Sequence, residues 1–363
     1  PYTTLFRSSL VDELIVNKYL IDCGTVASQQ MGRRPNELRV NGTENLVAVI
    51  SWRRARLDIA LITADNKIAF RDQIPLTEEE DKVDKITSTF FNIMKPKVGD
   101  RRIMGLCIII PGIIDAENKR ILSTVIGVGY SDPVVQRFEE AFHDYPFCLL
   151  NDTACFAYAE YVFANITEPN FAYINVSKGV GACLFANGKM LRGAGSNATQ
   201  FGHFSVDRNG PLCACGNHGC VERVVGENAL TERAEACGID LTRFAGRKPL
   251  YCDIGAMAED GDAHAKELIK DLAVDLSFAI SNLITLFNPS LVVIGGMGVN
   301  LGPFFLSKIR DEVQNSGFKE FVSNTWIQYS TLGLDSELGG AARYYIDHYY
   351  DFFEQMRGGL YAD

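Results

Sequence analysis

The hydrophobic pattern of the first half of the chain begins with a three-stranded meander. Three segments carry mostly apolar residues, and short polar stretches separate them. Runs of this length between turn residues are typical of strands that pair in sequence order. The predicted strands are 45–51, 57–63 and 67–70.

Two buried strands and a helix are predicted after this meander. Residues 103–110 form a continuous apolar run, as a strand covered on both faces does. Residues 147–150 are equally apolar and stop at Asn151, and 153–164 have the pattern of a helix with Thr153 near its cap. Strand and helix units in mixed order predict the α/β class.

The second half of the chain repeats this order. Residues 182–191 resemble 60–69 in sequence, and each stretch lies inside a predicted meander. The repetition predicts two lobes related by an internal duplication. The further predicted elements are strands at 171–176, 181–186, 189–191 and 291–294 and helices at 274–286 and 338–356.

The N-terminal segment has a pattern of its own. Residues 9–21 place four apolar side chains on one helical face, a basic turn follows at 32–35, and 38–41 alternate like a short strand. This order resembles the closing half of a winged helix-turn-helix, and the alternative is an amphipathic helix with a linker stiffened by Pro35. Residues 1–8 show no pattern connected to the rest of the chain, so we expect them to lie outside the fold. The helical face comprises Leu10, Val11, Leu14 and Ile15.

Composition narrows the class of protein. The chain of 363 residues is 47% hydrophobic, which is enough for two domains with cores. No run of 18 apolar residues and no secretory signal is visible, so we expect no membrane span and a cytoplasmic protein. The formal net charge of −10 disfavours a nucleic-acid surface over the bulk of the chain. Most of the ten cysteines are scattered through apolar runs, like the reduced, buried thiols of a cytosolic protein.

Three cysteines instead form a compact motif. Cys213, Cys215 and Cys220 lie within eight residues, glycines between them allow tight turns, and His203 lies ten residues ahead of the first thiol. Three thiolates and one imidazole suit a structural Zn²⁺ that has four protein ligands and no open position. The alternative is buried free thiols beside a surface histidine. We predict zinc, because three cysteines rarely cluster in this way by chance.

Together with Gly202-His203 and Glu222, this motif resembles the ROK family (repressors, open reading frames, kinases), closest to its xylose- and N-acetylglucosamine-repressor-like branch. The resemblance covers about residues 45–345 and implies a two-lobed actin-like fold of the sugar-kinase or hexokinase type. A partial winged helix-turn-helix remnant precedes it. The implied domains are 9–44, an N-terminal lobe 45–155 to which a helix at about 338–356 returns, and a C-terminal lobe 156–337 with the zinc loop.

The turns that bind nucleotide phosphates in the family's kinases are altered here. Where the kinases have Asp-x-Gly-Gly-Thr, residues 51–56 are Ser-Trp-Arg-Arg-Ala-Arg, without the acid and without the glycines that let backbone approach phosphate. The three arginines either bind an anion or form a solvated hairpin tip. Four glycines match other nucleotide-binding turns of the family, and hairpin geometry or packing explains them equally well. These vestigial positions are Gly179, Gly181, Gly295 and Gly296.

The resemblance also implies a sugar site. Asn151-Asp152 match the catalytic Asn-Asp of the kinases, but without a phosphate cradle we expect Asp152 to accept a hydrogen bond rather than a proton. Gln200 stands where the kinases have Glu and keeps an uncharged acceptor oxygen. His203 would bind zinc through one nitrogen and a sugar hydroxyl through the other. Glu222 would accept a further hydroxyl.

We therefore predict a sugar-responsive transcriptional repressor that binds a sugar between its lobes without phosphorylating it. In the full-length protein the N-terminal module would bind DNA, and a homodimer or homotetramer is the family tendency. The alternative is an ATP-dependent, glucokinase-like sugar kinase with Asp152 as its catalytic base. A third interpretation is a sugar-binding protein with neither activity. The replaced turn at Ser51-Trp52-Arg53-Arg54 favours the repressor.

Overall fold

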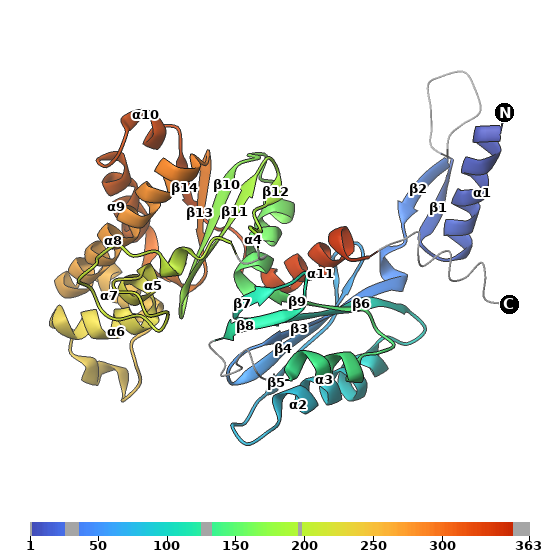
Figure 1. The fold of residues 1–363 in the computed structure, drawn as a ribbon, viewed down its shortest axis with the longest axis horizontal. Helices are drawn as coiled ribbons and strands as arrows, with labels where there is room; N and C mark the ends of the chain where they lie inside the picture. Colours follow the sequence, from blue (N-terminus) through green and yellow to red (C-terminus); the bar gives the residue numbers. More distant parts are fainter. Residues whose placement is uncertain (1, 26–35, 125–132, 195–197, 351–363) are drawn as a thin grey trace. The chain divides into compact units, whose positions relative to one another are not determined.

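A computed structural model describes residues 2–25, 36–124, 133–194 and 198–350, and Figure 1 shows its fold. The chain divides into two compact units, residues 1–158 with 337–363 and residues 159–336. Each unit contains a five-stranded sheet. Among the described helices, none is both long and apolar enough to cross a membrane.

The sheet of the first unit combines the predicted meander with two parallel strands. It consists of β3 (Asn45–Trp52), β4 (Arg56–Thr63), β5 (Ile68–Pro75), β6 (Arg102–Ile110) and β9 (Phe147–Asn151). The order is β5-β4-β3-β6-β9, with β4 antiparallel to both neighbours, β6 parallel to β3 and β9 parallel to β6. Each predicted strand of this half is confirmed, because continuous apolar runs between turn residues favour central strands.

Helices cover both faces of this sheet. On one face, Phe90 and Phe138 pack with alternate strand residues such as Ile50 in one apolar cluster. On the other face, Tyr345 donates a hydrogen bond of 3.0 Å to the carbonyl oxygen of Met104. The elements outside the sheet are α2 (Lys82–Thr89), η2 (Phe90–Met94), η3 (Lys95–Lys97), β7 (Gly112–Asp115), β8 (Arg120–Thr124), α3 (Val134–Ala141), α4 (Asp152–Phe163) and α11 (Ser336–His348).

The last of these helices differs from its predicted bounds. The sequence predicts 338–356, whereas α11 begins at Ser336 and ends at His348, and residues 351–356 lie outside the described part of the chain. Although α11 comes last in sequence, it lies beside the strands of the first unit in Figure 1. The first unit is therefore built from both ends of the chain.

The sheet of the second unit repeats the first. It consists of β10 (Phe171–Val176), β11 (Val180–Ala186), β12 (Lys189–Met190), β13 (Leu291–Gly295) and β14 (Trp326–Tyr329). The order β12-β11-β10-β13-β14 pairs an antiparallel meander with two parallel strands, as in the first unit. The shared strand order and directions confirm the predicted internal repetition.

The longest helix, α8 (Ala263–Phe287), begins earlier than the predicted 274–286. Its start is fixed by Asp262, whose Oδ1 accepts hydrogen bonds of 3.0 Å from the N–H groups of His264 and Ala265. The other helices of this unit are η4 (Phe201–His203), α5 (Val221–Val225), α6 (Glu227–Ala236), η5 (Leu241–Phe244), α7 (Tyr251–Glu259), η6 (Met297–Leu301), α9 (Gly302–Gln314) and α10 (Lys319–Val322).

The N-terminal segment forms a helix followed by an antiparallel hairpin. α1 (Tyr2–Val16) includes residues 2–8, so the expectation that residues 1–8 lie outside the fold is wrong. The hairpin pairs β1 (Leu20–Thr25) with β2 (Asn36–Val40), and a short turn of helix, η1 (Gly42–Glu44), leads into β3. The basic turn at 32–35 lies outside the described residues.

The predicted helix 9–21 is wrong at its C-terminal end. Lys18 has a positive φ of 61°, and the N–H of Tyr19 donates to the carbonyl oxygen of Leu14 at 2.8 Å. This is the hydrogen-bonding pattern of a Schellman cap, which ends a helix through one left-handed residue. Residues 20 and 21 consequently belong to a strand, although their apolar character continues the helical pattern.

Candidate functional site

One loop of the second unit gathers four metal-ligating side chains. His203, Cys213, Cys215 and Cys220 place their ligand atoms within 4.8 Å of one another. His203 Nδ1 lies 3.6 Å from Cys213 Sγ, and Cys215 Sγ lies 3.6 Å from Cys220 Sγ. Cys213 and Cys220 are buried, and Cys215 is exposed. The four predicted ligands therefore form one cluster that can hold a metal ion.

Glycines shape the loop that carries these ligands. Gly216 and Gly219 have positive φ angles of 90° and 60°. At Gly219 an added Cβ would also collide with the carbonyl oxygen of Asp207. The backbone amide of Asn217 lowers the pKa of the Cys215 thiol, which favours the thiolate form that binds metals. The loop is thus folded so that a side chain at Gly219 would disrupt it.

A second polar cluster lies where the strands of the first unit's sheet end. Because β3, β6 and β9 run parallel, their carboxyl ends meet at one edge. Arg53 follows β3, Asp152 follows β9, and Glu337 reaches the same place from the first turn of α11. The topology of one unit thus brings together residues from three distant parts of the chain.

Arg53 is the centre of this cluster. Its Nη1 lies 3.7 Å from Asp152 Oδ2, its Nε lies 3.7 Å from Asp58 Oδ2, and its Nη2 forms an ion pair with Glu337. The interpretation of Arg53 as part of a solvated hairpin tip is therefore wrong, because carboxylates of the same unit surround it. Arg54 is exposed, as a tip residue is, and Arg56 pairs with Asp58 at 2.9 Å.

Burial and ion pairing act in opposite directions on these carboxyl groups. Burial raises the pKa of Glu337 to about 7, and Arg53 opposes that rise. Burial likewise raises the pKa of Asp152, with Arg53 again the main opposing influence. The carboxylates in turn hold the pKa of Arg53 above its ordinary value, although burial acts to lower it. The charged forms of the two acids therefore depend on the Arg53 guanidinium.

Asn151 has a structural role beside Asp152. Its Nδ2 donates to the carbonyl oxygen of Gly112 at 2.6 Å, and its Oδ1 accepts from the N–H of Ala154 at 3.1 Å. Asn151 thereby caps α4, and Thr153, predicted to lie near the cap, is two residues beyond it. The N–H of Thr153 instead donates to Asp152 Oδ1 at 2.8 Å.

The remaining predicted sugar contacts belong to the second unit. Gln200 is exposed, and His203 and Glu222 are partly buried. Glu222 projects over the turn before β11, so an added Cβ at Gly179 would collide with its carboxylate. Gly179 therefore leaves room for Glu222, which explains this glycine without a nucleotide.

Packing also explains the glycines that follow β13. An added Cβ would collide with the Tyr173 side chain at Gly295 and with the side chains of Asn175 and Ser177 at Gly296, where φ is 78°. Gly181, the fourth of the matched glycines, pairs with Asn175 in the β10–β11 ladder. Packing therefore accounts for Gly179, Gly295 and Gly296 without a phosphate.

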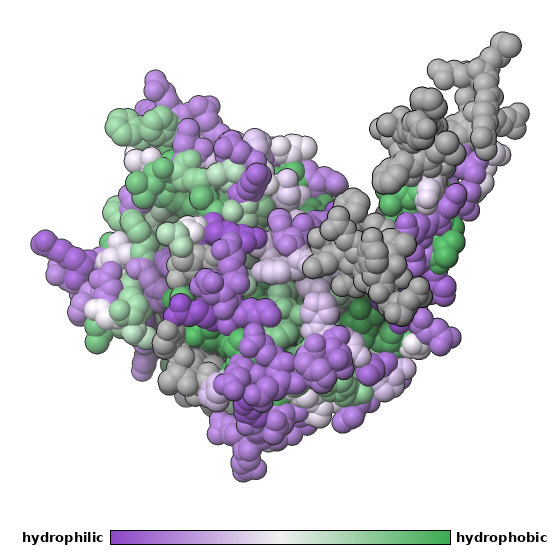
Figure 2. Space-filling model, turned by 45° about the vertical axis from the view of Figure 1, so that its right-hand side comes forward, coloured by the Kyte–Doolittle hydropathy of each residue, from purple (hydrophilic) through white to green (hydrophobic). Residues whose placement is uncertain are grey.

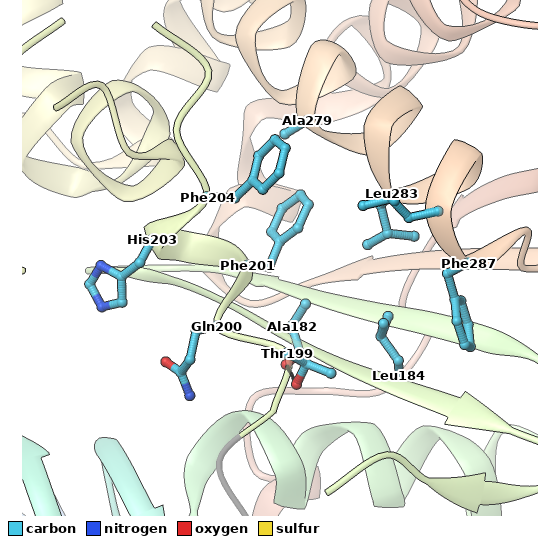
Figure 3. Close-up of a pocket in the computed structure, with 11 residues that line it drawn as sticks. Ala182, Leu184, Thr199, Gln200, Phe201, His203, Phe204, Ala279, Leu283 and Phe287 are labelled. Carbon is cyan, nitrogen blue, oxygen red and sulfur yellow. Dashed lines mark hydrogen bonds between the residues drawn. The ribbon is translucent and has the colours of Figure 1, made fainter. Parts of the chain in front are cut away.

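An apolar pocket of about 440 Å³ adjoins two of the predicted sugar contacts. Figure 3 shows Phe204, Leu283 and Phe287 between β11 and α8, with Gln200 and His203 toward one end. Hydroxyl groups need hydrogen-bond partners, so this lining does not suit a sugar ring. Hydrophobic side chains also show among the hydrophilic ones on the face seen in Figure 2, and Leu286 of this pocket is 82% exposed.

The repeated sheets and their covering helices define the two-lobed actin-like fold of sugar kinases and related regulators. The model of the ROK family matches residues 51–347, and the chain belongs to that family. It is 26% identical to the xylose repressor of Bacillus subtilis over 250 residues, which are 69% of this chain and 62% of that repressor. The chain thus spans less than two thirds of the length of this relative.

Two solved structures share the fold. A ROK family transcriptional regulator, described as a homologue of the Escherichia coli MLC protein, superimposes with a TM-score of 0.77 and 23% identity over 93% of this chain and 86% of its own. A ROK hexokinase from Thermus thermophilus superimposes with a TM-score of 0.66 and 23% identity, over 83% of this chain and 98% of its own. Regulators and kinases therefore have the same architecture, and local residues must distinguish them.

Proposed function

We propose that this chain is a sugar-responsive transcriptional repressor of the ROK family that binds a sugar without phosphorylating it. The observation that carries the proposal is the β3–β4 turn, where Arg53 pairs with Asp152. Phosphoryl transfer depends on positioning and neutralising the phosphates, for which the family's kinases use a glycine-rich turn. Here Arg53 and Arg54 stand in place of those glycines, and Trp52, the last residue of β3, is 1% exposed and packs in the core.

The sugar would be bound by polar side chains at positions that match the sugar site of the family. The proposed contacts are Asn151, Asp152, Gln200, His203 and Glu222. Carboxylate and amide oxygens accept hydrogen bonds from sugar hydroxyls, and Asp152 would do so without removing the proton. The kinase alternative is favoured by Asn151-Asp152, which match the catalytic pair of the family's kinases.

The N-terminal segment would supply DNA binding in the full-length protein. The helix and antiparallel hairpin of α1, β1 and β2 resemble the closing half of a winged helix-turn-helix, which supports this part of the proposal. A cytoplasmic homodimer or homotetramer would set the spacing of two such modules on an operator. The xylose repressor of Bacillus subtilis supports the regulatory role.

We further infer that the four-ligand cluster holds a structural Zn²⁺. Tetrahedral zinc, with Zn–S of about 2.3 Å and Zn–N of about 2.0 Å, separates its ligand atoms by about 3.5–3.8 Å. The two separations of 3.6 Å in the cluster fit that geometry. With all four positions taken by protein, the ion would fix the loop between His203 and Glu222 rather than act on a substrate.

The test measures sugar binding, operator binding and ATP turnover on the full-length protein. The sugars are xylose, glucose, N-acetylglucosamine and N-acetylmannosamine. We expect calorimetry to detect binding of at least one, that sugar to weaken operator binding in fluorescence anisotropy, and ADP release to stay at background. Sugar-dependent ADP release that Asp152→Asn abolishes would instead establish the kinase.

A further inference from the structure

The guanidinium of Arg53 faces carboxylates from three different elements. Asp58 lies on β4, Asp152 begins α4, and Glu337 lies in the first turn of α11. The nearest Arg53 nitrogens lie 3.7 Å from Asp58 and from Asp152, and Nη2 contacts Glu337. A planar cation with donors on several edges can face such a set at once, whereas an ammonium group is a point charge.

Backbone hydrogen bonding and packing fix Arg53 in this position. Its N–H donates to the carbonyl oxygen of Arg56 at 2.9 Å, which closes the turn between β3 and β4. The preceding Trp52 is 1% exposed, so the turn is anchored in the core, and the following Arg54 is exposed. Arg53 rather than Arg54 therefore reaches the carboxylates at the strand ends.

Because these three carboxyl groups are buried, their ionised forms need a positive charge nearby. The side chains of Glu337, Asp58 and Asp152 are 2%, 8% and 16% exposed. Ionised carboxylates at such depth need a partner charge, because burial removes their hydration. A divalent cation held by carboxylates is one common solution. In this chain Arg53 supplies the positive charge beside Asp152 and Glu337, and it shares Asp58 with Arg56, which lies 2.9 Å from that carboxylate.

We propose that Arg53 is a positioning residue, which neutralises Asp152 and orients it to accept a hydrogen bond from a sugar hydroxyl, and which takes the place of a divalent cation among Asp58, Asp152 and Glu337. The inference rests on the proposed function, since it explains how Asp152 binds a hydroxyl without removing its proton. The ion pair engages the carboxylate that a kinase would keep as its base.

The first experiment measures sugar affinity by calorimetry in three variants of the full-length protein. Arg53→Met removes the charge and is expected to weaken binding by at least about 10-fold. Arg53→Lys restores a positive charge and should recover part of that loss, which a purely packing role would not predict. Arg54→Met, the matched control on the same turn, should bind as the unsubstituted protein does. Equal affinity in Arg53→Met would overturn the inference.

The second experiment needs no sugar and separates this inference from the proposed function. Mn²⁺ binding is followed by electron paramagnetic resonance in Arg53→Gly and Arg53→Met, with circular dichroism to verify folding. We expect folded Arg53 variants to bind Mn²⁺ that the unsubstituted protein does not, and a second change, Asp152→Asn, to abolish it. If the protein binds no sugar, the proposed function fails, and Mn²⁺ binding alone then tests whether Arg53 takes the place of a divalent cation. Arg53 variants that bind no more Mn²⁺ than the unsubstituted protein would then refute the cation replacement.

Discussion

At the scale of single residues, Glu337 is the most unusual acid in the first unit. It is 2% exposed, its carboxyl pairs with Arg53, and burial raises its pKa to about 7 from an ordinary value of 4.5. An acid with a raised pKa binds its proton more tightly in the folded state than in the unfolded chain. Below about pH 4.5 both states are protonated, and the difference develops only as the pH rises.

Stability should consequently fall as the pH rises from about 4.5 to 7. The shift of Glu337 corresponds to a loss of roughly 3 kcal/mol in the free energy of unfolding across that window. Glu337→Gln keeps the size of the side chain without a titrating proton and should flatten the slope in urea titrations. Asp152 and Glu160, whose pKa values burial also raises, should keep a residual slope. Identical slopes in both proteins would contradict the prediction.

At the scale of elements, the loop that carries the four possible metal ligands depends on two glycines in different ways. Gly216 and Gly219 both have positive φ angles, so alanine is strained at either position. Only Gly219 is also crowded, because its added Cβ would collide with the Asp207 carbonyl oxygen, whereas Gly216 has open space around it. Alanine substitution at Gly216 therefore tests backbone strain alone, whereas substitution at Gly219 tests backbone strain together with a steric collision.

We expect Gly216→Ala to lower the free energy of unfolding by about 1 kcal/mol and to leave the metal content unchanged. Gly219→Ala forces the backbone to move. It should lower the free energy of unfolding by at least about 2 kcal/mol more than Gly216→Ala does, and it should also lower the metal content. Metal per chain, measured by mass spectrometry, and thermal unfolding give the two quantities. Equal metal content and equal melting temperatures in the two variants would show that the collision is relieved elsewhere.

At the scale of the whole molecule, contacts around Tyr19 join the N-terminal segment to the rest of the first unit. Tyr19 Oη lies 2.9 Å from Tyr350 Oη, just beyond the end of α11, and the Arg102 guanidinium lies 4.6 Å from the centre of the Tyr19 ring. Asn45 Nδ2 adds a hydrogen bond of 3.1 Å to the carbonyl oxygen of Lys18. Tyr19 is thus a point at which the segment is attached to the body by several side chains.

Loosening these contacts should affect the N-terminal segment alone. Tyr19→Phe removes the hydroxyl pair, worth about 1 kcal/mol, and Tyr19→Ala also removes the ring that Arg102 covers. Limited proteolysis should release the N-terminal segment faster in Tyr19→Phe and fastest in Tyr19→Ala, while 45–348 stays resistant. Cleavage within β3 or β6 at the same rate would mean that the substitution destabilises the whole unit.

The sequence predicted what single stretches of chain encode. Most strands of the two five-stranded sheets were found because they are apolar runs between turn residues, whereas β1, β7, β8 and β14 were not predicted. The ligand cluster was found because its cysteines are close in sequence. Helix ends were missed where one residue decides them, as Lys18 does for α1 and Asp262 for α8. The role of Glu337 was missed because no local pattern connects it with Asp152. The position of Arg53 could have been predicted in part. Arg53 and Asp152 each directly follow a buried strand, and the carboxyl ends of parallel strands meet at one edge of a sheet.

The placement of α11 also bears on how the polypeptide is made. Residues 159–336 are continuous, so this unit can form its internal contacts without the final helix. The first unit cannot form all its contacts without that helix. Tyr345 of α11 packs on one side of its sheet, and the Cys107 thiol donates a hydrogen bond to the Ala341 carbonyl oxygen of the same helix. During synthesis one face of the earliest strands must therefore remain uncovered until the last helix has been made, and apolar surface of this kind is prone to aggregation.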